Sequence, residues 1–225
     1  MKLILSRKGF DTSAGGGPSP ILTNHQMVSL PIPDRYSAVT YGDITHNGVC
    51  LGPLVEDLTK GRLLSHWGAH IDPDLRPDSL PRLPHWRPIF GQRGSAQAHL
   101  GNHQVGPGDL FLFFGLFRPA EQVHGTYRWV LHSRPCHVIW GWLQVAEVLS
   151  LATSRPQGYD WAAYHPHFQR GADAKNNVVY VAQPTLQLRQ GSYHRRRKGF
   201  PGAGAFPHFF HSLQLTAADG HKPSV

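Results

Sequence analysis

The sequence predicts a single α+β domain built around a mostly antiparallel, strongly bent sheet or a small β-barrel, with few short helices and long loops. Its 225 residues are enough for one sizeable hydrophobic core. The 24 Gly, 19 Pro and only 16% charged residues favour a loop-rich chain of strands over a helical bundle. Two long apolar runs rich in β-formers, 110–114 and 137–148, provide candidates for central strands.

The run from Leu110 to Phe114 is the clearest strand. It is too short for a helix and lies between the turn residues 106–109 and Gly115. Apolar side chains on both of its faces predict a strand that is buried on both sides. Gly115 is expected to let the chain bend, and Arg118 to deliver a charge just past the end of the strand.

The other elements are expected on similar grounds. Apolar residues at helical spacing predict a helix within 51–64, which Gly61 interrupts and whose end it could mark. A second, short helix is expected within 90–100, beginning near Gly94 or Ser95. The remaining expected elements are strands, at residues 1–6, 39–44 (broken at Gly42), 127–131, 137–148 and 178–182.

The charge balance predicts an anionic partner. A formal net charge of +8 and a sequence pI near 9.8 favour nucleic acid, although solubility alone is an alternative explanation. Four consecutive cations can follow a phosphate backbone or form a solvated loop: Arg195, Arg196, Arg197 and Lys198. We find no secretory signal and no apolar stretch approaching the length of about 20 residues that a membrane span needs, so a cytoplasmic protein without membrane contact is expected.

The segment after the first expected strand is a candidate phosphate-binding loop. Arg7, Lys8 and Asp11 are followed by a Gly/Ser/Thr-rich stretch at 12–20, whose backbone N–H groups could surround a phosphate. The spacing matches neither a P-loop nor a dinucleotide fingerprint, and a flexible surface loop is the alternative. We predict that these three residues contact substrate.

A histidine and two carboxylates form a candidate catalytic cluster. His70, Asp72 and Asp74 alternate in an extended segment, so both carboxylates could point the same way as the imidazole. Such a set can hold a divalent metal, or supply a general base and the group that orients it. A distant partner would be needed, and His99 is the candidate. A proline-rich loop with Asp turns is the alternative, and we assign no metal ligand and no cofactor.

Two further polar positions, Asp43 and Gln92, complete the candidate site. Asp43 could orient a hydroxyl or a base edge as a catalytic carboxylate, although capping a turn is the more common role for such a residue. Gln92 could contact a base edge or a ribose. His165 and His167 alternate as His70 and Asp72 do, but the proline between them weakens the case for a ligand pair.

Two tryptophans and a glutamine stand out in the 137–148 strand. Trp140 and Trp142 are expected on the same face, where they could hold a flipped base, although such aromatics are core residues more often. Gln144 would share that face. Because a buried glutamine needs hydrogen-bond partners, a nucleotide edge is one candidate. We predict that Trp142 and Gln144 contact substrate.

Several blocks together resemble the type-three nucleotide modification associated domain of bacteria and phages. The resemblance covers nearly the whole chain in order and rests on residues 4–11, 18–21, 30–34, 40–43, 70–74, 91–100, 106–118, 141–145 and 202–204. It implies a role in modifying nucleotides or DNA bases, with DNA or a nucleotide as partner and other DNA-modification enzymes as possible partners. Family members continue past a segment like 213–216 with a tryptophan-containing tail. The C-terminal part of this domain is therefore expected to be truncated or divergent.

A weaker, fold-level likeness connects the two long strands with the PUA, EVE and ASCH group of small β-barrels, which bind modified bases or RNA. Two functions therefore stay open. As an enzyme, the protein would hold phosphate through Arg7, Lys8 and Arg118 and use its Asp and His residues for acid–base or metal chemistry. As a PUA-like reader, it would stack a modified base on Trp140 or Trp142 without turnover. A scaffold subunit is a third, plainer possibility.

Overall fold

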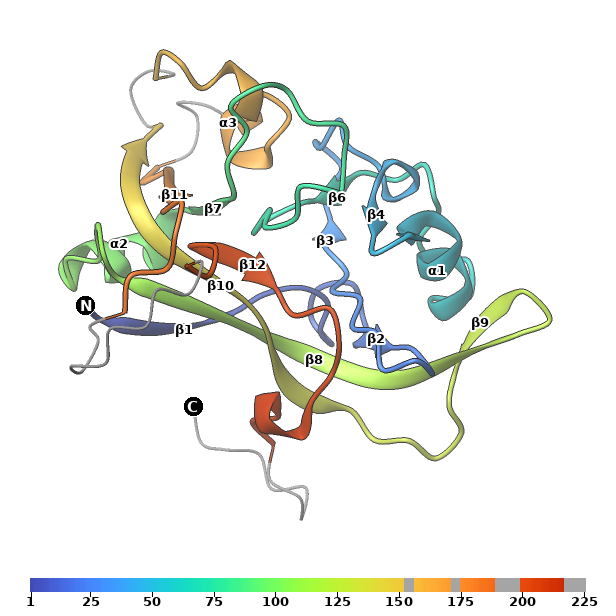
Figure 1. Cartoon of the computed structure of the whole chain (residues 1–225). Coiled ribbons are helices and arrows are strands. Elements are labelled where there is room, and N and C mark those ends of the chain that lie inside the picture. Colours follow the sequence, from blue (N-terminus) through green and yellow to red (C-terminus); the bar gives the residue numbers. More distant parts are fainter. Residues whose placement is uncertain (152–155, 171–174, 189–198, 217–225) are drawn as a thin grey trace.

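The computed structural model describes residues 1–151, 156–170, 175–188 and 199–216. Its frame is a pair of long antiparallel strands, β8 (Leu110–Val123) and β10 (Cys136–Ser150), which run through the molecule (Figure 1). Both strands are rich in aromatic and branched side chains, which pack well on a pleated surface. The other strands of the main sheet extend this pair on both sides.

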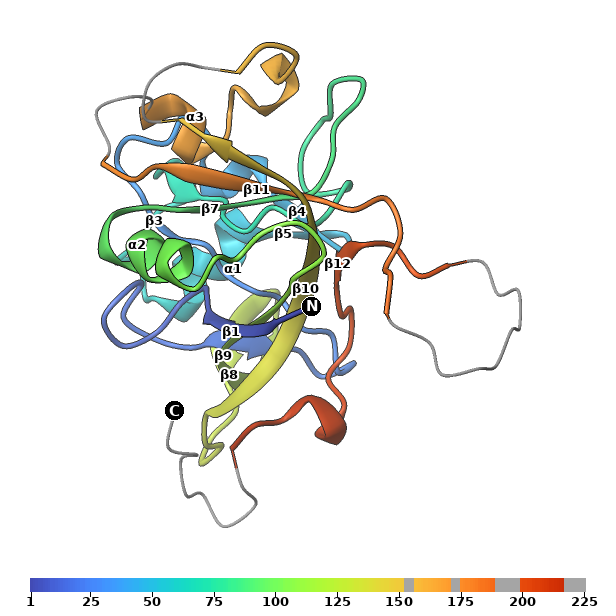
Figure 2. The same ribbon diagram turned by 90° about the vertical axis from the view of Figure 1, so that its left-hand side faces the viewer.

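The main sheet has eight strands and is mixed but mostly antiparallel. The strand order along the main path is β1 (Leu3–Arg7), β8, β10, β11 (Val178–Ala182) and β7 (Ile89–Gln92). Two further strands, β2 (Ser19–Ile21) and β9 (Thr126–Trp129), pair with β8. The last strand, β12 (Ala203–Ala205), pairs with β10. Among the strands described, β1 and β2 run parallel to β8, and the other pairs of the main sheet are antiparallel. The predicted α+β class with a bent sheet is confirmed, as β10 curves strongly (Figure 2). The barrel alternative is not formed, because the end strands β1 and β7 do not pair in the described residues.

Short elements surround this sheet. Two small ladders pair β3 (Ile32–Pro33) with β6 (Ala69–His70), and β4 (Thr45–His46) with β5 (Val49–Cys50). The helices are α1 (Leu51–Leu58), α2 (Gly94–Asn102), α3 (Pro166–Arg170) and the 3-10 turns η1 (Tyr41–Asp43), η2 (Asp160–Ala162) and η4 (His211–Leu213). None of the helices described is long and apolar enough to cross a membrane.

The segment 39–44, expected as a strand, forms the 3-10 helix η1 instead. Local hydrogen bonds produce this turn. The backbone N–H and the hydroxyl of Thr40 both donate to the carboxylate of Asp43, at 2.8 and 2.7 Å. This reciprocal cap closes a turn where β-propensity alone favours an extended chain.

Helix α1 is shorter than the predicted range 51–64, since it ends at Leu58. Lys60 and Gly61 both adopt positive φ, at 56° and 74°. The N–H of Gly61 then donates to the carbonyl of Glu56 at 2.8 Å, which closes the helix end in a Schellman arrangement. The glycine therefore terminates the helix.

Strand β8 continues straight through Gly115, where the sequence predicted a bend. A Cβ atom at this position would lie 2.7 Å from the carbonyl oxygen of Lys8, and the N–H of Lys8 donates to the carbonyl of Phe114 at 2.8 Å. The glycine is needed for this close approach of two backbones. It holds the exit of β1, and with it Lys8, against the sheet.

A β-bulge in β10 separates the two tryptophans that the sequence placed on one face. The register against β8 shifts by one residue at Trp140, whose ring packs in the core beside Phe113 with a centroid separation of 5.9 Å. Trp142 packs against Phe206 instead, at 4.9 Å, and its indole N–H donates to the carbonyl of Pro201. Alternation in a sequence cannot reveal such an inserted residue.

His46, at the end of β4, makes the stability of the fold depend on pH. Burial lowers its pKa to about 3, and the nearby Arg76 and Arg82 add to this effect. The folded state therefore keeps the imidazole neutral, whereas the unfolded chain protonates it below its ordinary pKa of about 6.5. The contribution of His46 is complete above about pH 6.5 and is lost as the pH falls towards 3.

We expect the variant His46→Gln to lose less free energy of unfolding on acidification than the wild-type protein. The difference should reach at most about 1.4 kcal/mol for each pH unit below about 6.5. Urea titrations of both proteins at about pH 7.5 and pH 5 measure it. Identical losses in the two proteins would contradict a neutral buried His46.

Candidate functional site

A cleft of about 500 Å³ opens between the exit of β1, the segment after β3, strands β6 and β7, and helix α3. This volume suits a small ligand such as a nucleotide. Charged side chains from distant parts of the sequence line it. The cations are Arg7, Lys8, Arg35, Arg93 and Arg170, and the carboxylates are Asp11, Asp34 and Asp72.

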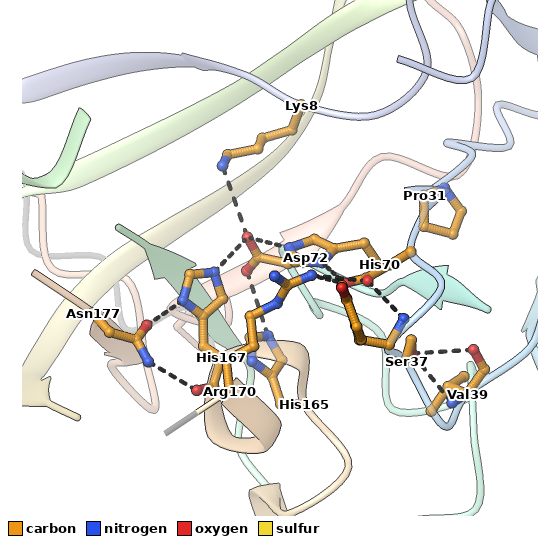
Figure 3. A network of polar contacts seen from close by, with 12 residues as sticks. Lys8, Pro31, Ser37, Val39, His70, Asp72, His165, His167, Arg170 and Asn177 are labelled. Atoms are coloured by element: carbon orange, nitrogen blue, oxygen red, sulfur yellow. Dashed lines mark hydrogen bonds and ion pairs between the residues drawn. The ribbon is translucent and has the colours of Figure 1, made fainter. Parts of the chain in front are cut away.

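The carboxylate of Asp72 lies at the centre of this site, with a side chain only 2% exposed (Figure 3). Its Oδ1 accepts a hydrogen bond from the N–H of Gly91 at 2.6 Å and lies 3.4 Å from Nε2 of His165. Its Oδ2 lies 3.7 Å from both Nζ of Lys8 and Nε2 of His167. Polar groups from three separate segments thus surround one buried carboxylate.

Asp72 and Lys8 form a buried ion pair. Burial by itself raises the pKa of Asp72, but Lys8, His165 and His167 outweigh it, so that the pKa lies well below its usual range. Burial also lowers the pKa of Lys8, and the charge of Asp72 offsets only part of that effect. The ammonium further lies 4.5 Å from the centroid of the Phe90 ring, a cation–π contact.

His70 is oriented by a second carboxylate. Its Nδ1 lies 2.8 Å from Oδ2 of Asp34, an oxygen that also accepts a hydrogen bond from Arg170 at 2.8 Å. The other oxygen of Asp34, Oδ1, accepts from the N–H of Tyr36 at 3.0 Å. The hydrogen bond from His70 is the largest cause of the lowered pKa of Asp34, with Arg170 contributing further. Because an ionised carboxylate only accepts hydrogen bonds, Nδ1 of His70 carries a proton. In neutral His70, Nε2 then has a free lone pair, 3.9 Å from Oδ2 of Asp72.

His167 is oriented by an amide in the same manner. Its Nδ1 lies 2.6 Å from Oδ1 of Asn177, whose Nδ2 in turn donates to the carbonyl of His167 at 2.9 Å. This second bond places the amide oxygen opposite Nδ1, so that Nδ1 carries the proton. Burial lowers the pKa of His167 to about 4, which keeps the ring neutral near pH 7. Its Nε2 is therefore an unprotonated base that faces Asp72.

Local backbone structure places these groups. The β3–β6 pair sets His70 opposite Ile32, two residues before Asp34. Helix α3 begins at Pro166, a residue that is favoured in the first helical turn, and holds His167 and Arg170 three positions apart on one face. The site thus combines a short ladder with a short helix that follows it by almost 100 residues.

Gly91 on β7 provides the space that the imidazole of His167 occupies. A Cβ atom at this position would lie between 2.1 and 2.5 Å from three atoms of that ring. We therefore expect Gly91→Ala to displace His167 and to lower the free energy of unfolding by about 1–3 kcal/mol through overpacking. Urea titration measures the loss, and NMR of the imidazole protons reports the displaced ring.

The matched control is Gly101→Ala in α2, where an added Cβ meets nothing within 4 Å. Alanine has the higher helix propensity, so this variant should be as stable as wild type or up to about 1 kcal/mol more stable. If Gly91→Ala matched this control in stability and left the imidazole signals unchanged, the proposed steric conflict would be disproved.

Six of the residues that the sequence nominated come together at this cleft. They are Arg7, Lys8, Asp11, His70, Asp72 and Gln92. Arg7 pairs with Asp11 at 3.0 Å, and Asp11 also accepts hydrogen bonds from Ser13 and from the N–H of Ala14. Asp74 lies apart from them, because Arg82 and Tyr164 bind its carboxylate on another side of the segment.

Five other nominated residues do not line the cleft. Asp43 is exposed and caps η1, and His99 is exposed on α2, where its ring lies 4.3 Å from that of His103. Arg118 donates to Ser133 Oγ at 3.0 Å and to the carbonyl of Val130. Trp142 and Gln144 lie in the middle of β10, opposite Leu112 and Leu110 of β8.

The side chain of Gln144 forms its hydrogen bonds with groups of the protein itself. Its amide nitrogen donates to the carbonyls of Gly108 and Gln187 at 3.1 and 3.0 Å, and its oxygen accepts from the N–H of Gln187 at 2.6 Å. The side chain therefore fastens the segment after β11 to the turn before β8. The basic cluster of Arg195, Arg196, Arg197 and Lys198 lies outside the described residues.

The site contains several groups that the sequence did not nominate. Asp34 orients His70 and is itself held by Arg170, Asn177 orients His167, and His165 and His167 face Asp72 directly. The alternation of His165 and His167 was the only signal, and the intervening proline obscured it. That proline starts α3, which is what turns His167 towards Asp72.

A family model described as nucleotide modification associated domain 3 matches residues 2–225. No curated protein and no solved structure matches the chain.

Proposed function

The chain belongs to the nucleotide modification associated domain 3 family, and we propose on this basis that it is an enzyme that modifies a nucleotide or a DNA base in the cleft around Asp72. The observation that carries the proposal is the buried carboxylate of Asp72, which three imidazoles and an ammonium group approach at the floor of the cleft. A protein that only reads a base needs hydrogen bonds and a stacking surface. Buried ionisable groups with shifted pKa values are typical of catalytic sites.

The groups facing the cleft can transfer protons. Because Nδ1 of His167 donates to Asn177 and the ring is neutral near pH 7, its Nε2 has a free lone pair, and Nε2 of His70 has one whenever that ring is neutral. Either imidazole can accept a proton from a substrate hydroxyl, amine or water as a general base. The charge of Asp72 then stabilises the imidazolium that forms, as a neighbouring carboxylate does in other proton-transfer sites.

The rim of the cleft fits an anionic, aromatic substrate. Arg93 is exposed, and within the described ranges its guanidinium makes no hydrogen bond or ion pair, so it is available for phosphate. Tyr36 is 61% exposed, with the guanidinium carbons of Arg35 and Arg170 at 4.6 and 5.3 Å from its ring centroid. A nucleobase can stack on such an aromatic surface while its phosphate contacts the arginines.

The decisive experiment is mass spectrometry of nucleosides. Nucleosides from DNA and from the free nucleotide pool are compared between a host that expresses the intact gene and the same host with an empty vector. We expect a nucleoside mass that occurs only with the gene. Unchanged nucleosides, together with tight binding of the purified protein to modified DNA, would reject the enzyme in favour of a reader.

A further inference from the structure

We propose that His70, Asp72 and His167 bind one divalent transition-metal ion at the floor of the cleft. The sequence left a divalent metal open as one role for His70 and Asp72 but assigned no ligand. The proposal rests on the proposed function only in that the ion would serve the same reaction. The binding itself follows from the donor atoms and can be tested without any activity.

The three donor atoms converge on one point. Nε2 of His70, Nε2 of His167 and a carboxylate oxygen of Asp72 all lie within 4.8 Å of one another. The separations from Oδ2 of Asp72 are 3.9 Å to His70 and 3.7 Å to His167. Metal bonds of about 2.0–2.2 Å place neighbouring ligands of a tetrahedral ion about 3.4 Å apart, so small side-chain rotations would complete the contacts.

No proton bridges these donors when both rings are neutral. Each imidazole already uses its Nδ1–H in a hydrogen bond, to Asp34 in one case and to Asn177 in the other. Both Nε2 atoms therefore direct lone pairs at an anionic oxygen. Such an arrangement of three electron-pair donors is stabilised by a cation, and neutral imidazole with carboxylate is a common ligand set for divalent transition metals.

The surroundings of the two imidazoles are those of metal ligands. A histidine that binds a metal through one nitrogen almost always donates its other N–H to a carboxylate, a carbonyl or a water. Asp34 plays this part for His70, at 2.8 Å, and Asn177 for His167, at 2.6 Å. Arg170 holds Asp34 in turn through two contacts of 2.8 Å. The ring orientations are thus fixed before any ion binds.

A second feature points to an additional ligand at this place. The side chain of His165 is fully buried, and neither of its ring nitrogens has a hydrogen-bond partner among the described residues, although Nε2 lies 3.4 Å from Oδ1 of Asp72. Buried polar atoms rarely stay unpaired. An ion bound to one oxygen of Asp72 would leave Oδ1 free to turn towards Nε2 of His165 and so supply one of the two missing partners.

Two histidines and one carboxylate leave coordination positions open, and all three ligands line the cleft, so a substrate atom or a water could reach the ion. Lys8 competes for the same oxygen of Asp72, at 3.7 Å. We therefore expect an affinity in the micromolar range.

The test is a titration of the purified full chain, stripped with a chelator, with Co²⁺ and separately with Zn²⁺. It is performed in the variant His103→Gln, because His99 and His103 form an exposed pair on α2 that could bind metal by itself. We expect one ion per chain by calorimetry and a Co²⁺ absorption spectrum typical of nitrogen and oxygen ligands. The changes His70→Gln and His167→Gln should each weaken binding by about 10-fold or more.

Crystals of the wild-type chain soaked with Zn²⁺ provide a measurement that does not depend on how well the variants fold. An anomalous peak between the three donors is expected. The proposal is overturned if the folded chain takes up no ion, or if binding is equally strong in His70→Gln and His167→Gln. Metal binding without a new nucleoside would reject only the proposed function, whereas a new nucleoside in a chain that binds no ion would reject only the metal site.

Discussion

Replacing Asp72 with Asn is expected to lower the rate of nucleotide modification by at least about 100-fold. The change keeps the shape of the side chain but removes its charge. Asp72 is the group that Lys8, His165 and His167 all contact, so the variant weakens both the proton-transfer groups and the proposed ion. The measurement is the amount of modified nucleoside formed per protein molecule, determined by mass spectrometry.

Loss of folding has to be separated from loss of chemistry, because the variant leaves the ammonium of Lys8 buried without its partner. Circular dichroism and urea titration of Asp72→Asn provide this control. A second control is Asp160→Asn, which changes an exposed carboxylate outside the cleft and should retain full activity. Activity of Asp72→Asn within about three-fold of wild type would refute a catalytic part for this residue.

The elements that depend on local pattern could be predicted from the sequence. Strand β11 has the bounds 178–182 that its branched residues indicated, and α1 starts at Leu51 as expected. The bulge at Trp140 and the turn at Tyr41–Asp43 could not be predicted, because each depends on hydrogen bonds that override a regular alternation of side chains. A strand pattern continues through a bulge without any mark in the sequence.

The part of the site that is local in sequence, His70 and Asp72, could also be predicted. His70 and Asp72 are neighbours in the chain, so their chemistry was visible, but the choice of a distant partner was not. The sequence offered 16 histidines, and the alternation of His165 and His167 was too weak a signal to prefer the buried His167 over the exposed His99. The packing of α3 against β6 and β7 makes that choice, and packing between segments almost 100 residues apart leaves no periodic signal.

Gly91 and Gly115 show how such long-range placement is encoded. At Gly91 the absent Cβ leaves space for the ring of His167, and at Gly115 for the backbone of Lys8. Both glycines lie within strands, where glycine is unfavourable by itself. Their position therefore indicates that another part of the chain packs closely against the strand, as the site requires. Interpreting every glycine as a turn or a bend does not reveal this.

Replacing Arg82 with Ala is expected to lower the free energy of unfolding by about 3–5 kcal/mol. The guanidinium makes two hydrogen bonds to Asp74, at 2.7 and 2.8 Å, and lies 4.2 Å from the ring centroid of Trp86. The side chain of Asp74 is only 1% exposed, so the variant would leave a buried carboxylate without its counter-charge. Urea titration near pH 7 measures the loss.

The control for the expected loss in Arg82→Ala is the variant Arg128→Ala. Arg128 also pairs with a carboxylate, at 2.9 Å from Glu121, but the two side chains are 61% and 32% exposed. Water screens such a pair, and its loss should cost less than about 1 kcal/mol. Equal losses in the two variants would contradict the argument that burial makes the Arg82–Asp74 pair indispensable.

The same pair also bears on the site, because the backbone of Asp74 exchanges two hydrogen bonds with Ile89 of β7, at 2.9 and 3.0 Å. These bonds fasten the segment that carries Asp72 to the strand that carries Gly91. If Arg82 acts through this connection, the double variant Arg82→Met with Asp74→Asn should recover much of the lost stability, since it removes the unpaired charge and keeps the backbone bonds. A double variant as unstable as Arg82→Ala would show instead that the packing of Arg82 on Trp86, and not the balance of charge, holds this segment in place.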